Sequence, residues 1–188
     1  MIYQYIYCLS FTIVNGLFGL STPKKFPYII DSVIKKGGFG IVFKGRSKFD
    51  NKQFVAIKAE DSKKSDNLER ENKIYSDLEG RKGFPKIFWF GVTTINYTKL
   101  KKVKSNILVM ELLGPDIESL LDKADGNFSL KTVLMLVEQF LNRVEYLHSK
   151  NYIHQDLKPE NFLMGIGESE GLVYLADFGV TKRYNPTT

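Results

Sequence analysis

Short apolar and β-branched runs, separated by turns that contain glycine, make up the chain from Phe26 to about residue 113. Runs of this kind are typical of β-strands. They predict two strands over residues 28–34 and 41–44, on either side of a glycine-rich turn. Further strands are expected over residues 54–58 and 107–112.

Two segments instead space their apolar residues by three and four positions, which predicts helices. The first is expected over residues 66–78, ending at Gly80, and Glu71 interrupts its apolar face. A carboxylate that faces a core needs a cation as its partner. The second is a long helix from its cap at Ser129 to about residue 150. Its expected apolar face consists of Leu130, Val133, Leu134, Val137, Leu141, Val144 and Leu147.

The dipeptide Gly114-Pro115 separates the strands from the long helix. The order of strands, one helix, a breaker and further helices predicts two lobes that meet at this hinge. We expect residues 24–113 to form a β-rich lobe and residues 114–188 to belong to a helical lobe. The lysine-rich segment 93–105 is interpreted as a solvated loop.

Residues 1–23 contain no Asp, Glu, Lys or Arg and precede Lys24 and Lys25. This length and the lysines that follow suit a membrane anchor with a cytoplasmic flank. Polar residues such as Gln4 and Asn15 dilute the apolar run, however. We therefore favour a disordered extension or a gene-model artefact over an anchor, and we expect no membrane partner.

The composition is that of a globular protein, with 43% hydrophobic and 26% charged residues in a chain of 188. The single cysteine, Cys8, excludes an intramolecular disulfide framework and favours a cytoplasmic or nuclear location. The net charge of +6 suits an anionic partner without choosing one. No recognised nucleic-acid motif or aromatic stacking platform is present, so we expect no nucleic-acid partner.

The strongest chemical signal is the run His-Gln-Asp-Leu-Lys-Pro-Glu-Asn at residues 154–161, followed by Asp-Phe-Gly beginning at Asp177. Phosphoryl transfer needs a carboxylate that orients a hydroxyl, oxygen ligands for metal ions and cations on the phosphates. Asp156 can orient the hydroxyl or take its proton, and Lys158 can hold the transferred phosphoryl group. Asn161 and Asp177 offer oxygen ligands for Mg²⁺. A polar loop without this chemistry would not require such spacing.

Two features nearer the N-terminus fit the same chemistry. The run Val-Ala-Ile-Lys places Lys58 at the end of a predicted strand, where it can reach the α- and β-phosphates. Glu71 is its natural partner, which accounts for the interrupted apolar face. A glycine-rich turn upstream of Lys58 lets backbone N–H groups approach phosphates. This turn consists of Gly37, Gly38, Phe39 and Gly40.

These motifs resemble those of protein kinases, and other segments resemble the casein kinase 1 family. The segments are residues 83–85, 89–91, 108–115, 131–139 and 161–167, and the resemblance extends from about Phe26 to Tyr184. It implies an α+β bilobal fold, with a β-rich N-lobe and the first part of a helical C-lobe around an ATP-binding cleft. Met110 would be the gatekeeper, with residues 111–113 lining the adenine.

The resemblance implies a monomeric serine/threonine protein kinase that uses ATP and Mg²⁺ and acts on protein substrates, acidic or already phosphorylated. Asp156 and Lys158 are the implied catalytic residues, and Asn161 and Asp177 the implied metal ligands. The implied nucleotide-binding residues are Ile34, Gly37, Gly38, Phe39, Gly40, Val42, Ala56, Lys58, Glu71, Met110, Glu111, Leu113, Asn161 and Asp177. His154 resembles a structural histidine of the family.

The sequence departs from the family pattern in three places. Lys35 replaces the first glycine of the phosphate loop, and Gln155 replaces the arginine that usually precedes the catalytic aspartate. The sequence ends at Thr188, before most of the helices expected of the C-lobe. The alternative function is therefore a truncated, non-catalytic nucleotide-binding fragment, in which Leu134 and Leu141 lack packing partners and form an exposed apolar patch.

Overall fold

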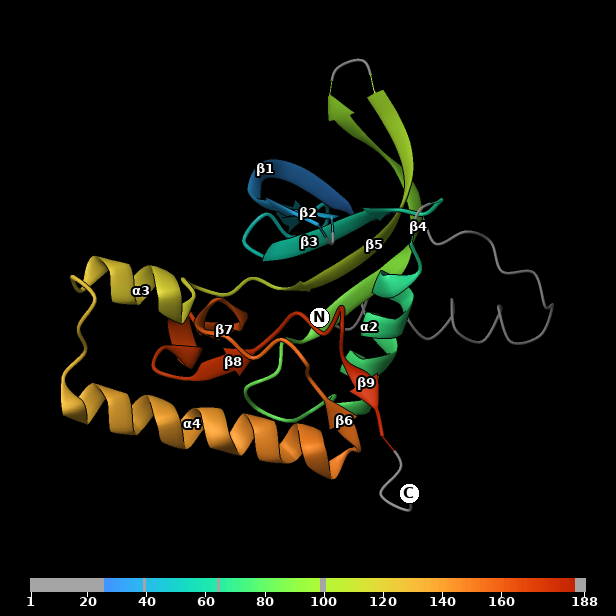
Figure 1. Ribbon diagram of the computed structural model, residues 1–188. Coiled ribbons are helices and arrows are strands. Elements are labelled where there is room, and N and C mark those ends of the chain that lie inside the picture. Colours follow the sequence, from blue (N-terminus) through green and yellow to red (C-terminus); the bar gives the residue numbers. More distant parts are fainter. Residues whose placement is uncertain (1–25, 39, 64, 99–100, 185–188) are drawn as a thin grey trace, which may run out of the picture.

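The computed structural model describes residues 26–38, 40–63, 65–98 and 101–184 (Figure 1). Its N-terminal lobe is a five-stranded antiparallel sheet in the order β1-β2-β3-β5-β4. The strands are β1 (Tyr28–Gly37), β2 (Gly40–Ser47), β3 (Phe54–Asp61), β4 (Ile87–Thr98) and β5 (Lys101–Glu111). The four strands predicted from the apolar runs are present, and β1, β2, β3 and β5 are each longer than the run that predicted them.

The central strands β3 and β5 are buried on both faces, to which successive side chains point in alternation. On one face, Val55 and Ile57 of β3 pack with Val109 of β5. On the other face, Ala56 and Met110 belong to a second core that continues into the helical lobe. The residues that point to this second face are therefore the ones available to line a cleft between the lobes.

The predicted first helix is α2 (Asn67–Asp77), which lies beside β4 and β5. It buries Leu68, Ile74 and Tyr75 together with Glu71. The Leu68 N–H donates to the carboxylate of Glu60 at 2.9 Å, which satisfies one of the unpaired N–H groups at the start of the helix. Glu71 consequently faces the interior, as its place on the apolar face predicted.

The prediction of a solvated loop over residues 93–105 was wrong. Residues 93–98 and 101–105 lengthen β4 and β5 into a paired arm that projects beyond the other strands (Figure 1). Side chains alternate along the arm: Lys102 and Lys104 are exposed, whereas Ile95 and Ser105 are buried. These two lysines therefore lie on the solvent side of a two-stranded ribbon. The alternation of exposed and buried residues has the period of two that is typical of a strand, but the solvated-loop prediction considered only the number of lysines.

The C-terminal lobe combines helices with two small antiparallel sheets. Its helices are α3 (Ile117–Lys123) and α4 (Leu130–Ser149), with two 3-10 turns at Pro159–Asn161 and Gly167–Ser169. Its sheets pair β6 (Tyr152–Ile153) with β9 (Lys182–Arg183), and β7 (Phe162–Met164) with β8 (Val173–Leu175). β8 ends two residues before Asp177.

The long helix α4 begins as predicted, with the Ser129 side chain accepting a hydrogen bond from the Thr132 N–H. Its expected apolar face is only partly buried. Val144 and Leu147 pack on the core, together with Leu136 and Phe140. The rest of the predicted face is exposed, namely Leu130, Val133, Leu134, Val137 and Leu141. The helix thus carries two apolar stripes, and only the stripe that faces β6 and β8 has partners among the described residues.

The exposed stripe includes Leu134 and Leu141, with 61% and 64% of their surface accessible. This agrees with the patch expected for these two leucines. The buried side of α4 holds β8 by polar contacts as well. The Arg143 Nε donates to the Val173 carbonyl at 3.0 Å, and the Val173 N–H donates to the Gln139 side chain at 2.9 Å. These bonds fix the strand that leads directly to Asp177.

No helix in the described part of the chain is long and apolar enough to cross a membrane. Residues 1–23, on which the anchor and extension alternatives rest, lie outside the described residues. Phe39, one of the predicted nucleotide-binding residues, lies outside them too.

Candidate active site

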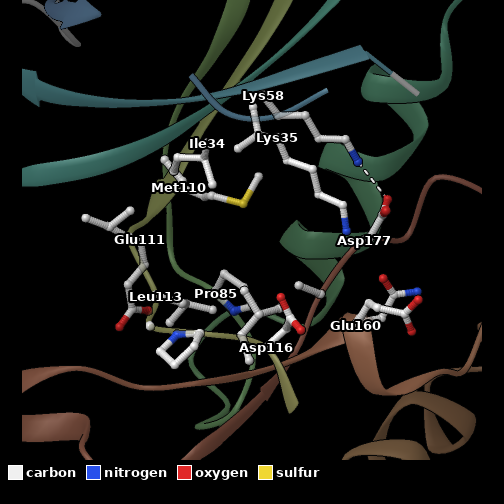
Figure 2. Close-up of a pocket in the computed structure, with 18 of the residues that line it drawn as sticks. Ile34, Lys35, Lys58, Pro85, Met110, Glu111, Leu113, Asp116, Glu160 and Asp177 are labelled. Atoms are coloured by element: carbon white, nitrogen blue, oxygen red, sulfur yellow. Dashed lines mark hydrogen bonds and ion pairs between the residues drawn. The ribbon is translucent and has the colours of Figure 1, made fainter. Parts of the chain in front are cut away.

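A cavity of about 270 Å³ lies between the second face of the sheet and the C-terminal lobe (Figure 2). Side chains from β1, β2, β3 and α2 line it from the N-terminal lobe, and the segment after β5 closes one side. The predicted nucleotide-binding residues in its lining are Ile34, Val42, Ala56, Lys58, Glu71, Met110, Glu111, Leu113, Asn161 and Asp177. Most of the nucleotide-binding residues predicted from the sequence therefore line one cavity.

Lys58 lies at the inner end of the cavity and contacts two carboxylates. Its Nζ is 2.6 Å from Oε2 of Glu71 and 2.7 Å from Oδ1 of Asp177. Such short distances are typical of charge-assisted hydrogen bonds. The ion pair predicted between Lys58 and Glu71 is present, and Asp177 joins it from the other lobe.

Burial and charge act in opposite directions on these groups. Burial opposes the charge on Lys58, but the carboxylates of Glu71 and Asp177 outweigh it and raise the pKa of Lys58. Burial raises the pKa of Glu71, and Lys58 limits this rise. Burial also acts to raise the pKa of Asp177, but Lys58 and the Gly179 backbone N–H hold that pKa below its usual value. Lys58 and Asp177 are therefore both ionised at neutral pH.

An aromatic column behind the cavity connects the two lobes. The ring of Phe178 meets the ring of Tyr75 edge-on at 4.9 Å and the ring of His154 at 5.3 Å. The Asp177 N–H also donates to the Tyr75 hydroxyl at 3.4 Å. Asp177 has a φ of 65°, a strained conformation for a residue other than glycine. The packing of Phe178 and the bond to Tyr75 hold it there.

His154 is buried and links the loop that follows it, residues 155–158, to the segment after β8. The Asp156 N–H donates to Nδ1 of His154 at 3.3 Å, and Nε2 lies 3.2 Å from the Ala176 carbonyl. Because Nδ1 accepts, the proton of the neutral ring belongs on Nε2. Burial lowers the pKa of His154, which favours this neutral form. The contacts are those of the structural histidine implied by the resemblance.

Asp156 is oriented by the two residues expected to work with it. Lys158 Nζ lies 2.9 Å from Oδ2 of Asp156. The amide nitrogen of Asn161 donates to the Asp156 carbonyl at 2.7 Å and to Oδ2 at 3.1 Å. The hydrogen bond from Lys158, followed by that from Asn161, holds the pKa of Asp156 below its usual value. The carboxylate is thus ionised and fixed in direction.

The protein kinase domain family model matches residues 28–188, which is most of the chain. The chain belongs to the protein kinase family. Members of this family are phosphotransferases that use ATP with Mg²⁺ and act on proteins. The five-stranded sheet over a helical lobe is the α+β fold expected from the resemblance, and the cavity lies between its two lobes.

Some residues that line the cavity of this kinase were not among the predicted site residues. They are Lys35, Tyr75, Pro85, Gly114, Pro115, Asp116, Glu160, Leu163 and Ala176. Leu163 lies in β7, two residues after the predicted metal ligand Asn161. Asp116 could have been found as a helix cap, since it accepts from the Ser119 N–H at 2.8 Å. Lys35 stood out only as the replacement for the first loop glycine, which does not predict where its side chain points.

Other predicted residues of the kinase lie beside the cavity rather than in its lining. Asp156 and Lys158 stand on the loop next to Asn161, and Gly37, Gly38 and Gly40 form the turn between β1 and β2. Gly40 has a φ of 117°, and a Cβ there would lie 2.2 Å from the Ala59 carbonyl oxygen, so this position requires glycine. The role of the turn in phosphate binding stays a prediction.

Proposed function

We propose that this kinase transfers the γ-phosphate of ATP to serine and threonine hydroxyls of proteins, in the manner of the casein kinase 1 family. One observation carries the proposal. The Lys58–Glu71–Asp177 ion-pair cluster at the inner end of the cavity adjoins a loop on which Asp156 is bonded to Lys158 and Asn161. A phosphate cation, metal-binding oxygens and a hydroxyl-orienting carboxylate are thereby assembled within one site.

The outer part of the cavity suits a purine. Val42 and Ala56 approach from the sheet and Leu163 from the other lobe, which provides apolar surfaces for the two sides of a flat ring. The N–H groups of Glu111 and Gly114 bind the carbonyls of Lys86 and Met164. Within the described residues the Leu113 N–H has no such partner, so it is available to hydrogen-bond the base.

The inner part of the cavity suits the phosphates and a metal ion. Asn161 uses its amide nitrogen on Asp156, which leaves its amide oxygen for a cation, and Asp177 adds an ionised carboxylate. No cluster of three His, Cys, Asp or Glu residues in the described ranges could hold a metal alone. This donor set fits Mg²⁺, which is usually bound by one or two protein oxygens together with substrate phosphates. Bound there, Mg²⁺ would neutralise charge on the phosphates.

The chain's own contribution to transfer is positioning and charge. The ionised carboxylate of Asp156 accepts a hydrogen bond from the substrate hydroxyl. It receives the hydroxyl proton as the hydroxyl oxygen bonds to the γ-phosphorus and the bond from that phosphorus to the leaving ADP oxygen breaks. Lys158 places a cation beside that carboxylate, where the phosphoryl group arrives. Lys58 holds the α- and β-phosphates, and Glu71 keeps its amine directed into the cavity.

The test is transfer of labelled γ-phosphate from ATP to casein and to matched peptides whose only acceptor is serine, threonine or tyrosine. We expect label on serine and threonine, and a preference for acidic or pre-phosphorylated peptides over neutral ones. Asp156→Asn should lower the rate by on the order of a hundredfold or more. Label on tyrosine alone, or an Asp156→Asn variant as active as the parent, would overturn the proposal.

The alternative is a nucleotide-binding module without transferase activity. The exposed apolar stripe of α4 favours it, because loops hold catalytic geometry only when a packed scaffold supports them. Mg²⁺-dependent ATP binding in calorimetry, with no transfer to any of the peptides, would select this alternative.

A further inference from the structure

The path of β1 beside the glycine turn is irregular in a way that affects the cavity. Val33 pairs with Phe43 of β2, but Lys35 already pairs with Val42, so Ile34 is an extra residue in β1. An irregularity of this kind is a β-bulge, which changes the direction of the side chains that follow it. In a regular strand, Ile34 and Lys35 would point to opposite faces. Here both line the cavity.

The pairing of Lys35 with Val42 agrees with this direction. Residues directly opposite each other in an antiparallel pair lie on the same face, and Val42 also lines the cavity. Figure 2 shows the Lys35 side chain extending from β1 into the cavity, toward the end where Lys58 and Asp177 lie. The position that usually holds the first glycine of a phosphate loop therefore carries a cation directed inward.

The cavity is lined by more acidic than basic side chains. In the described lining, two lysines face five carboxylates. The acidic residues are Glu71, Glu111, Asp116, Glu160 and Asp177. Lys58 is already engaged with Glu71 and Asp177, whereas Lys35 makes no ion pair with any residue that the structure describes. The positive charge of Lys35 is therefore available to bind the polyphosphate of a nucleotide that enters this acidic cavity.

We propose that Lys35 is a second phosphate-binding residue of the nucleotide site, which acts through its side chain on the di- or triphosphate and not on the nucleoside. This inference rests on the proposed binding of ATP. It differs from the usual role of a glycine-rich loop, whose backbone N–H groups make the contacts. In this chain the bulge at Ile34 directs a lysine into the space that a first glycine leaves open.

The neighbouring lysine provides a matched control. Lys36 pairs with Ile41 and is not part of the cavity lining, although it has the same charge and lies on the same strand. Replacing either lysine with glutamine changes the net charge of the protein by the same amount. A difference between the two variants therefore reports position and not overall charge.

The experiment is calorimetric binding of adenosine, ADP and ATP to the full chain and its Lys35→Gln, Lys36→Gln and Lys35→Arg variants, with Mg²⁺ present. We expect Lys35→Gln to weaken ATP binding about tenfold, the effect of one partly exposed charged contact, and to leave adenosine binding within twofold. Lys36→Gln should match the parent, and Lys35→Arg should keep most of the ATP affinity. Raising the salt concentration should weaken ATP binding less in Lys35→Gln than in the parent.

Equal ATP affinity in Lys35→Gln and the parent would overturn this inference while leaving the proposed function intact. An equal loss of adenosine and ATP affinity would also overturn it, because it would show a structural role for Lys35. Failure of the parent itself to bind ATP would instead overturn the proposed function, and the role of Lys35 with it.

Discussion

The Nζ of Lys58 lies 2.6 Å from Oε2 of Glu71, and the two residues are only 7% and 1% exposed. The pair joins β3 to α2, and the contact of Lys58 with Asp177 extends it to the C-terminal lobe. Removing one partner of a buried ion pair leaves an uncompensated charge, which is more costly than removing both. Lys58, which we propose binds the phosphates, therefore also stabilises the fold.

Lys58→Met should abolish nearly all phosphoryl transfer and also destabilise the fold by about 3–5 kcal/mol at neutral pH. Burial raises the pKa of Glu71, and without Lys58 little opposes this effect. A carboxyl group with a raised folded-state pKa contributes stability below its unfolded pKa of about 4.3 and loses it as the pH rises through the folded value. The deficit of the variant should therefore be small near pH 4.5 and grow toward pH 7.

Thermal unfolding across this pH range provides the measurement, with Lys58→Met/Glu71→Leu as the control. The double variant removes both charges, so it should recover much of the stability and lose the additional pH dependence. A Lys58→Met variant as stable as the parent at pH 7 would show that the pair contributes little.

Asp177→Asn should raise the Mg²⁺ concentration needed for nucleotide binding by about tenfold or more, because a neutral amide is a poorer ligand for a hard cation. The substitution also weakens the contact with Lys58, so thermal unfolding without Mg²⁺ should be compared first. Titration of Mg²⁺ at fixed nucleotide concentration gives the midpoint. An unshifted midpoint would mean that Asp177 is not a metal ligand.

Gln155 should make the activity independent of phosphorylation in the segment that follows Asp177. The residue is exposed and has a φ of 65°, and its neutral amide brings no charge with which to hold a phosphate. Phosphatase treatment should leave turnover unchanged, with a mock-treated sample as the control. Loss of activity after this treatment, and its return when that segment is phosphorylated again, would contradict the prediction.

Two leucines of α4 should differ sharply in their contribution to stability. Leu147 is 0% exposed within the core, and Leu147→Ala should cost about 2–5 kcal/mol of unfolding free energy. Leu141 is 64% exposed, so Leu141→Ala should cost less than about 0.5 kcal/mol. Urea unfolding of the two variants provides the comparison. Similar losses in both would show that the stripe containing Leu141 is covered in solution.

The core of the site could be predicted from the sequence because short-range rules act there. The run ending at Lys58 reads as a strand, and the spacing of apolar residues in α2 puts Glu71 on the buried face. A buried carboxylate requires a cation, so the pair followed from these two patterns. The kinase motifs at 154–161 and at Asp177 likewise have a spacing that the chemistry imposes. In the structure Asn161 and Asp177 line one cavity, and Asp156 lies beside it.

Other features depended on contacts between distant segments. The periodicity of α4 defines two apolar stripes. Packing against β8 and β6 decides that the stripe with Val144 and Leu147 is the buried one. The lysine-rich segment 93–105 extends two strands because β4 and β5 pair along it. Pairing of β1 with β2 also sets the bulge at Ile34 and thereby the direction of Lys35. Periodicity within a segment determines which residues share a face, whereas only the partner segment determines which face is buried and in which register.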